Sequence, residues 1–441
     1  MVQNAFGAMG FSAEAATLLE FPVTMFDPGS DLTPLKENID KVVEGLTKWQ
    51  PAVKTKGISP PPPMVKVRGR DYADAVAQMN LLFLKNRWGD GLPIVPPTKE
   101  RVNWILRGTD LPRDSIVGKI LPRGGIATVE GMAVCLAMAG GRPEHLPVLL
   151  AAVEAMIIPK QRHFHLNSTT NSCLPVVVVN GPVARQIRLN SGYGCLGPSA
   201  EYPAGAAIGR ALRLVMLTVG GGVPGRGSMS LYGGPGRYAN VVFAEDEAGL
   251  PPGWKSISAD FGYSRGKNTV VFHNVSSTTN INGTSVGDEA SALKALNLIA
   301  AFMRVPNHNC YFLDTYDGCP GIVLVSRNTA AGLVHAGWSK EKIREYLWEN
   351  SKIPWSEVKK LGYEEEARAS GIPEGEPLPI TRKPENLILG VAGGMQAQHS
   401  YWMQMGVSGW PTSAEIRRPE NTRWNELLKE AINDLGPVPE K

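Results

Sequence analysis

The sequence predicts an α/β fold with mixed or parallel sheets flanked by helices, and three observations support it. Val-rich runs such as CLPVVVVNGP (173–182) lie between Pro and Gly, as buried strands do. Apolar segments with helical length and spacing alternate with them, for example LPVLLAAVEAMI (146–157). The 441-residue chain also exceeds the size of one ordinary hydrophobic core, so we expect two or three domains.

The same order of predicted elements occurs twice along the chain. Residues 154–187 and 300–333 each read as a helix, a polar loop with Cys and Pro, a short apolar strand, a turn and a helix. The offset of about 146 residues predicts a possible internal duplication of an α/β unit, although ordinary α/β patterning also produces such an echo. We expect a Pro-rich linker at 54–64, a first α/β unit at 65–265, and a second at 266–441 with a C-terminal flap.

Composition argues against several classes of protein. The net charge is +4 and the basic residues are scattered among acidic ones, which argues against a nucleic-acid partner. No apolar run reaches the length of a membrane span, and the first residues lack the pattern of a signal peptide. Five cysteines without a CxxC spacing are typical of reduced thiols. We therefore expect a soluble, cytoplasmic protein that does not associate with membranes.

The segment HFHLNSTTNSC (163–173) is the first candidate for chemistry. If it is extended, His163 and His165 point the same way, as metal ligands sometimes do. Thr169, Thr170 and Cys173 add hydroxyl and thiol groups. A polar loop ahead of a buried strand explains the same residues, and no third ligand has a recognised spacing. The cofactor is therefore unknown, with a divalent metal as one option.

Polar residues also follow the predicted strands. Asn180 ends the Val-rich strand, where α/β proteins collect ligand groups. Further amide, hydroxyl and carboxylate candidates are Asn190, Ser191, Tyr193, Glu245, Asn280 and Asn282. Glu245 belongs to FAEDEAG (243–249) and suits a general base or a cation ligand, but such an acidic run is more often a solvated turn. The other residues serve equally well as a pocket wall or as turn residues.

The stretch TVGGGVPGRGSMSLYGGPGRY (218–238) is unusually rich in glycine. Glycine lets main-chain N–H groups approach a ligand closely, and Arg226 and Arg237 are placed to face an anion. The spacing matches neither the P-loop nor the dinucleotide-binding pattern. The alternative is a long surface loop or a loop at a subunit interface.

Several segments resemble one known family. WGDGLPIVPPTKERV (88–102), TVEGMAVCLAMAGG (128–141), VVVVNGPVARQIRLNSGYGCLGP (176–198) and FAEDE (243–247) look like the UGSC-motif (seleno)proteins and their long relatives. The resemblance covers most of residues 65–410, and residues 1–53 resemble the last part of a UGSC-like domain. That domain has the look of a thiol or selenol redox module. The chain contains no UGSC or CGSC tetrapeptide, so no redox residue can be carried over.

The resemblance implies a partner and a class of function. A second subunit is expected to carry the N-terminal part of the UGSC-like domain, which makes the assembly a hetero-oligomer; loss of the module is the alternative. We expect an enzyme subunit that acts on a small molecule by thiol-assisted redox chemistry or carbon–heteroatom bond cleavage. Its pocket is expected to combine loops 163–173, 190–199, 226–237 and 276–285, with His163, His165, Cys173 and Glu245 as catalytic candidates. A metal-dependent lyase or hydrolase using His163 and His165, or a noncatalytic scaffold subunit, remain alternatives.

Overall fold

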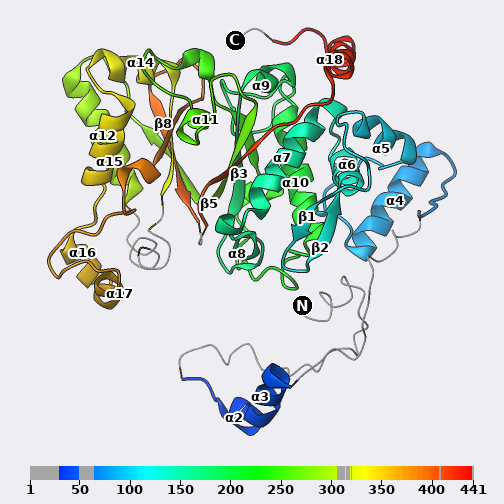
Figure 1. The fold of residues 1–441 in the computed structure, drawn as a ribbon, viewed down its shortest axis with the longest axis horizontal. Helices are drawn as coiled ribbons and strands as arrows, with labels where there is room; N and C mark the ends of the chain where they lie inside the picture. Colours follow the sequence, from blue (N-terminus) through cyan, green and yellow to red (C-terminus); the bar gives the residue numbers. More distant parts are fainter. Residues whose placement is uncertain are drawn as a thin grey trace.

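The computed structural model describes residues 29–48, 64–304, 313, 318, 320–406 and 409–439. Its centre is a seven-stranded mixed sheet flanked by helices, which confirms the predicted fold class (Figure 1). The strands follow the order β4-β3-β5-β8-β6-β7, with β9 paired to β5. Their bounds are β3 Leu174–Asn180, β4 Val241–Ala244, β5 Thr269–Asn282, β6 Gly321–Val325, β7 Ile388–Val391, β8 His399–Met405 and β9 Thr412–Glu415. A separate hairpin is formed by β1 (Ile116–Ile120) and β2 (Gly125–Thr128).

The sheet consists of two halves with the same arrangement of strands. β3 is parallel to β4 and antiparallel to β5, and β6 is parallel to β7 and antiparallel to β8. The strands also have matching spacing along the sequence. The start of β3 (Leu174) is as far from the start of β6 (Gly321) as the start of β4 (Val241) is from the start of β7 (Ile388). β5 and β8 pair with each other and join the halves. β5 therefore contacts both halves, and it begins just after the domain boundary expected at residue 265.

The sheet is curled, so that two of its corners meet. The backbone N–H of Asp246, just beyond β4, donates to the carbonyl of Val391 at the end of β7 (2.8 Å). Arg327 binds Asp246 through both guanidinium branches. An apolar cluster that includes Val176, Val178, Val271, Ile322 and Met403 fills one face of the curled sheet. The contact between the two corners thus closes the sheet over its own core.

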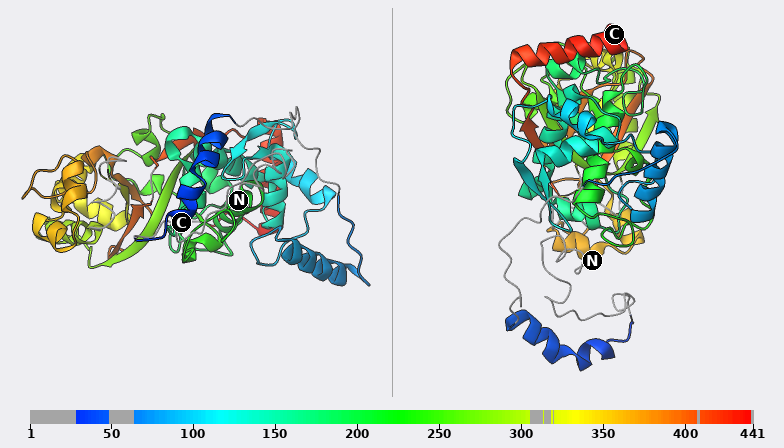
Figure 2. Two further views of the ribbon diagram at one scale, coloured as in Figure 1. Left: turned by 90° about the horizontal axis from the view of Figure 1, so that it is seen from below. Right: turned by 90° about the vertical axis from the view of Figure 1, so that its right-hand side faces the viewer.

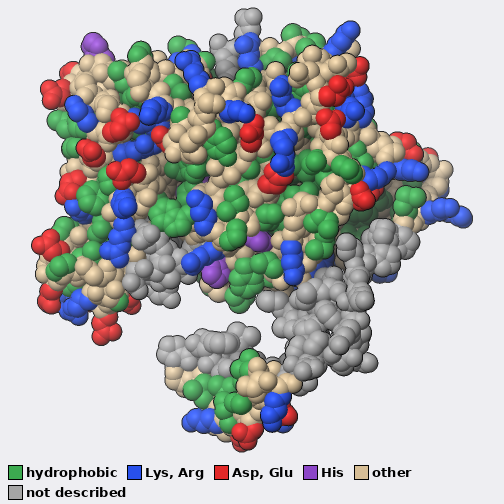
Figure 3. Space-filling view, viewed as in Figure 1, with side chains coloured by type: hydrophobic (Ala, Val, Ile, Leu, Met, Phe, Trp, Pro, Cys, Tyr) green, Lys and Arg blue, Asp and Glu red, His purple; other side chains and the backbone are tan. Residues whose placement is uncertain are grey.

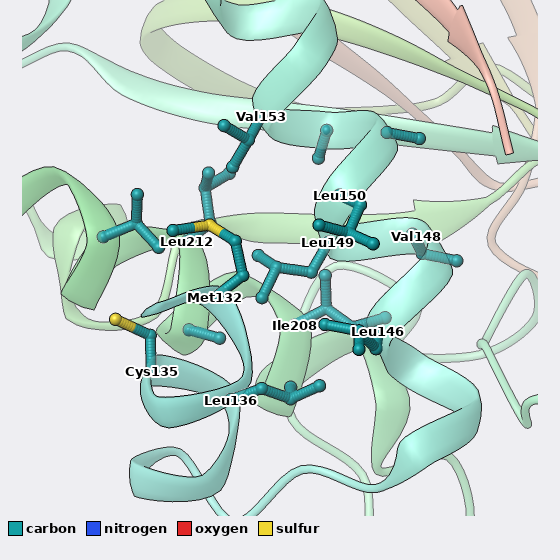
Figure 4. Packing of buried hydrophobic residues seen from close by; sticks show 14 of the residues in the cluster. Met132, Cys135, Leu136, Leu146, Val148, Leu149, Leu150, Val153, Ile208 and Leu212 are labelled. Carbon is teal, nitrogen blue, oxygen red and sulfur yellow. The ribbon is translucent and has the colours of Figure 1, made fainter. Parts of the chain in front are cut away.

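Helices cover the other face of each half. In the first half these are α6 (Val129–Met138), α7 (Leu146–Ile157) and α10 (Ala204–Leu214), whose apolar side chains point toward one another (Figure 4). In the second half they are α12 (Glu289–Met303), α14 (Arg327–His335) and α15 (Lys340–Asn350). Side chains of β3 alternate between the two faces, with Val177 and Val179 toward the helices. β3 is therefore buried on both sides, as its Val run predicts.

Further helices complete the two halves. They are α4 (Tyr72–Asn86), α5 (Lys99–Leu106), α8 (His163–Ser168), α9 (Pro182–Gln186), α11 (Ile257–Asp260), α16 (Trp355–Lys360) and α17 (Glu364–Ala369). α5 and α6 begin at N-cap threonines, Thr98 and Thr128, whose side chains accept from the backbone N–H three residues on. The segment expected as a C-terminal flap instead contains β8, whose Trp402 is fully buried.

The chain ends its path on the first half. After β8, β9 pairs with β5 on the edge opposite β3, and α18 (Asn421–Leu435) buries Trp424 and Leu427 against the first-half core. α2 (Thr33–Glu37) and α3 (Ile39–Thr47) stand apart from the body, and neither has a buried residue (Figures 1 and 2). Residues 1–28, most of the expected linker, Cys310 and Cys319 lie outside the described residues. Among the helices described, none is long and apolar enough to cross a membrane.

Candidate anion-binding cavity

The two predicted histidines do not share a face. Residues His163–Ser168 form α8, so side chains two residues apart leave the helix axis in directions roughly 200° apart. The prediction of an extended segment was wrong. His163 is buried, and its Nε2 accepts a hydrogen bond from the backbone N–H of Leu121 (3.1 Å). Burial lowers the pKa of His163, so the neutral ring serves as a structural acceptor.

His165 and the three described cysteines also do not form a metal-binding cluster. Burial and the nearby Arg162 lower the pKa of His165, whose ring packs against Phe164. Cys135, Cys173 and Cys195 are all buried, and burial raises the pKa of the Cys135 thiol to about 11. Among the described residues, no group of three or more His, Cys, Asp or Glu side chains is placed to hold a metal ion.

Glu245 is buried, not exposed on a solvated turn. It follows β4, and its Oε2 accepts from Asn180 Nδ2 (2.6 Å) and from the backbone N–H of Ile257 (2.7 Å). Burial raises the pKa of Glu245 to about 7, although the positive charge of Lys340 and both hydrogen bonds oppose this shift. Asp246 is also buried, against Arg327. The solvated-turn interpretation of the FAEDEAG segment was therefore wrong for its first two acids.

The expected pocket is divided between the two ends of β3. The glycine-rich loop packs on segment 163–173 at the amino end: Met229 N–H donates to Ser168 O, and Leu231 N–H donates to Thr170 O. Asn180 and Glu245 lie at the carboxyl end, seven strand residues and roughly 20 Å away. One small molecule does not reach both groups.

The remaining predicted residues are distributed over these regions. Thr169 accepts from Asn171 N–H, and Asn190 caps its own turn through Gly192 N–H and Tyr193 O. Ser191 is buried and its carbonyl accepts from Gly393 N–H, while Tyr193 is 65% exposed. Asn280 and Asn282 are exposed near the far end of β5, where Asn280 contacts His399. These contacts belong to turns and strand ends.

A cavity of about 960 Å³ lies on the other side of the glycine-rich loop. Its walls come from α4, the turn at 89–94, the end of α10 and loop residues 223–237. Phe83, Leu84, Leu92, Ile94 and Leu217 give it an apolar surface. The volume lies in the range of small-molecule sites, which combine apolar walls with a few placed polar groups.

Two buried arginines supply the polar part of this cavity. Arg213 is 5% exposed and Arg237 is 9% exposed. Arg237 is held by the loop backbone: it donates to the carbonyls of Cys173 (2.6 Å) and Leu166 (3.4 Å), and to Ser228 Oγ (3.2 Å). No hydrogen bond or ion pair joins Arg213 to any residue that the structure describes. Burial and the nearby charge of Arg237 lower the pKa of Arg213 to about 10.

The nearest carboxylate is already engaged. Asp90 lies on the cavity wall, but Arg210 binds it from the neighbouring turn of α10 through Nε (2.8 Å) and Nη2 (3.0 Å). Arg210 also donates to Pro93 O, and so fixes the turn at 89–94 against α10. Asp90 attracts Arg213 only at longer range. The cavity therefore has a rigid wall and an unneutralised positive charge.

Close packing of the backbone holds the glycine-rich loop in place. α10 continues into a π-helical turn (Val215–Val219), a local geometry that is frequent at functional sites. A Cβ at Gly227 would overlap the carbonyl oxygen of Gly221, and one at Gly222 would overlap the Asn167 side chain. Asn167 in turn donates to Leu121 O (2.8 Å) and Met216 O (3.1 Å). Here the glycines permit a compact wall that presents Arg237.

Sequence reasoning singled out part of this cavity's wall. It singled out the glycine-rich loop and Arg237 as an anion site, and the structure places Arg237 on the cavity wall. Arg226 lies outside this cavity, on the wall of a smaller one. Arg213 was missed, although a signal existed: RALRLVML (210–217) places two arginines in an otherwise apolar helix. A cation on a buried helical stretch needs either a partner or a ligand.

Comparison of the chain with models of protein families, with curated proteins and with solved structures found no match.

Proposed function

We propose that this chain binds a small anionic molecule, a carboxylate or a phosphate ester, in the cavity beside α4. The observation that carries the proposal is Arg213, a buried guanidinium with no partner among the described residues. Removing one partner from a buried ion pair costs roughly 3–5 kcal/mol, because the remaining charge is buried and uncompensated. An anionic ligand supplies the missing charge and forms charge-assisted hydrogen bonds of the strong kind.

The chain performs this role as an enzyme subunit. The resemblance to UGSC-motif proteins supports a heteromeric assembly in which a second subunit supplies the thiol or selenol. The chemistry then remains thiol-assisted redox or carbon–heteroatom cleavage, and this chain binds and orients the substrate. The apolar face of α3 supports a partner surface, because Ile39, Val43 and Leu46 are all more than 45% exposed.

The test compares wild type with Arg213→Gln in two conditions. Without ligand, we expect the variant to unfold at the same temperature as wild type or higher, since it loses an uncompensated buried charge. With increasing inorganic phosphate or succinate, wild type gains stability as a bound ligand requires, about 2.7 kcal/mol at 100 times Kd. The variant should not show that saturable gain. Calorimetric titration of both proteins gives the affinity directly.

The control variant is Arg265→Gln, which removes the same charge from an exposed loop. Phosphate also stabilises folded proteins in general by exclusion from their surface, so the informative quantity is the difference between the two variants. Two results would show that Arg213 is structural. One is that Arg213→Gln lowers stability without ligand, and the other is that it binds the probes as well as Arg265→Gln does.

A further inference from the structure

We infer that the ligand carries two anionic groups, the second of which binds in a smaller cavity next to the first. This inference rests on the proposed function, since it assigns the first anionic group to Arg213 and Arg237. The second cavity has a volume of about 340 Å³. It lies between the end of α4, the turn after β1 and the start of the glycine-rich loop.

Four cationic side chains line the second cavity: Lys85, Arg87, Arg123 and Arg226. The residues that line it include no carboxylate. Elsewhere, on the face shown in Figure 3, Lys and Arg are interspersed with Asp and Glu. Like charges around one concavity repel each other, and a bound anion relieves that repulsion. The composition of this cavity therefore indicates a ligand group of opposite charge.

The cations are held by different parts of the chain and remain available. Arg123 donates to the carbonyl of Thr218, which fixes it against the π-helical turn, and burial lowers its pKa. No ion pair joins Lys85, Arg87 or Arg226 to another residue within the described ranges. Arg87 adopts a left-handed conformation at the end of α4 (φ 58°, ψ 41°), where glycine would cost less. Strained residues cluster at functional sites, among other places.

The two cavities are adjacent. Arg87 and Val223 line both of them, so the two spaces share this part of their wall. The apolar side chains of Phe83, Leu84 and Leu217 belong to the first cavity alone. The matching ligand has an anionic group at Arg213, a less polar middle along this wall, and a second anionic group near Lys85 and Arg226. A dicarboxylate or a phosphorylated carboxylic acid has this chemistry.

The experiment measures what the second anionic group adds to affinity. Calorimetric titration of the full chain compares glutarate, adipate and pimelate with monocarboxylates of the same carbon number. A parallel series compares alkyl phosphates with ω-phosphonocarboxylates. We expect the best two-headed ligand in at least one series to bind tenfold or more tightly than its one-headed partner. Lys85→Ala and Arg226→Ala should remove that advantage and leave one-headed binding unchanged, because both residues line only the second cavity.

Controls and outcomes separate this inference from the proposed function. Lys66→Ala and Arg265→Ala remove exposed cations elsewhere and should keep the tenfold advantage. Two results overturn the two-headed ligand. One is that the second anionic group raises affinity less than threefold in both series. The other is that its advantage survives in Lys85→Ala and Arg226→Ala. In that case, one-headed binding that requires Arg213 leaves the proposed function standing. Absence of any Arg213-dependent binding overturns both.

Discussion

At the scale of single residues, burial decides what each ionisable group can do. Glu245 and Arg213 are both buried. Glu245 accepts hydrogen bonds from two donors, whereas Arg213 has no partner among the described residues. Glu245 lies between the two halves, where the positive charge of Lys340 lowers its pKa and so opposes the effect of burial. Lys340 is itself buried, and its Nζ donates to Asp260 (2.8 Å) and to Lys255 O (2.7 Å). Glu245 is thus a structural carboxyl whose protonation controls stability.

The first prediction concerns the pH dependence of that stability. The pKa of Glu245 is raised from 4.5 to about 7, so between these values the folded state holds a proton that the unfolded chain releases. The stabilising contribution is fully present below about pH 4.5 and is lost as the pH rises through 7. A shift of this size corresponds to about 3 kcal/mol. Urea unfolding at pH 5 and pH 8 should show wild type losing most of that amount relative to Glu245→Gln, which cannot ionise.

The matched control is Glu201→Gln, an exposed site. Its pH profile should run parallel to that of wild type. If the profiles of wild type and Glu245→Gln are also parallel, Glu245 has no raised pKa and this account is wrong.

At the scale of elements, α7 shows how an apolar sequence becomes the centre of a half. Ten of its twelve residues are buried, and it lies between α6, α10 and the sheet (Figure 4). Leu149 has no exposed surface. A helix that is apolar on all sides is stable only when neighbours cover all of them. α7 therefore depends on the elements packed around it.

The second prediction is that Leu149→Ala lowers the free energy of unfolding by about 3 kcal/mol, through lost burial and the cavity left behind. Leu81→Ala in α4 is the comparison, because Leu81 is 59% exposed. The cost there should stay within about 0.5 kcal/mol. Chemical denaturation measures both, and equal costs would contradict the assigned burial.

The elements also show what the sequence could predict. Apolar spacing and flanking Pro and Gly located α7 and β3, because these signals act locally. In β5 only TVVFHNV (269–275) has the apolar pattern of a strand, but the strand continues to Asn282. Its second part, SSTTNIN, has no run of apolar residues and becomes a strand because it pairs with β8. α8 was missed for a related reason: a six-residue helix at the end of a connection carries little periodic signal.

The candidate site was predicted in part for the same reason. Arg237 follows a glycine-rich segment, which is visible in the sequence, whereas its approach to Arg213 depends on how the loop folds back over α10. The four cations of the second cavity come from positions 85, 87, 123 and 226. Their convergence is a property of the tertiary structure.

At the scale of the whole molecule, the contact between the two sheet corners joins the halves. Asp246 is almost fully buried there, and Arg327 is its partner. β5 and β8 provide the other connection through their backbone ladder. The Arg327–Asp246 ion pair thus joins the two halves at the sheet corners, and the ladder between β5 and β8 joins them at the centre of the sheet.

The third prediction is that Arg327→Met costs about 3 kcal/mol in the free energy of unfolding at pH 7, because it leaves the Asp246 carboxylate buried without its partner. Lys267→Met is the control: both side chains of its pair with Glu415 are about half exposed, and such pairs contribute less than about 1 kcal/mol. Equal costs for the two variants would show that the corner contact does not stabilise the fold.

The return of β9 and α18 to the first half affects the order in which the protein is built during translation. The ribosome completes β3, β4 and the helices around α7 well before it reaches residues 412–435. Until then, the surface that Trp424 and Leu427 cover stays open to water and to chaperones. The first half is therefore finished only after the second half has been synthesised. A ribosome that stalls within the second half would display an incomplete first half, a substrate for quality control.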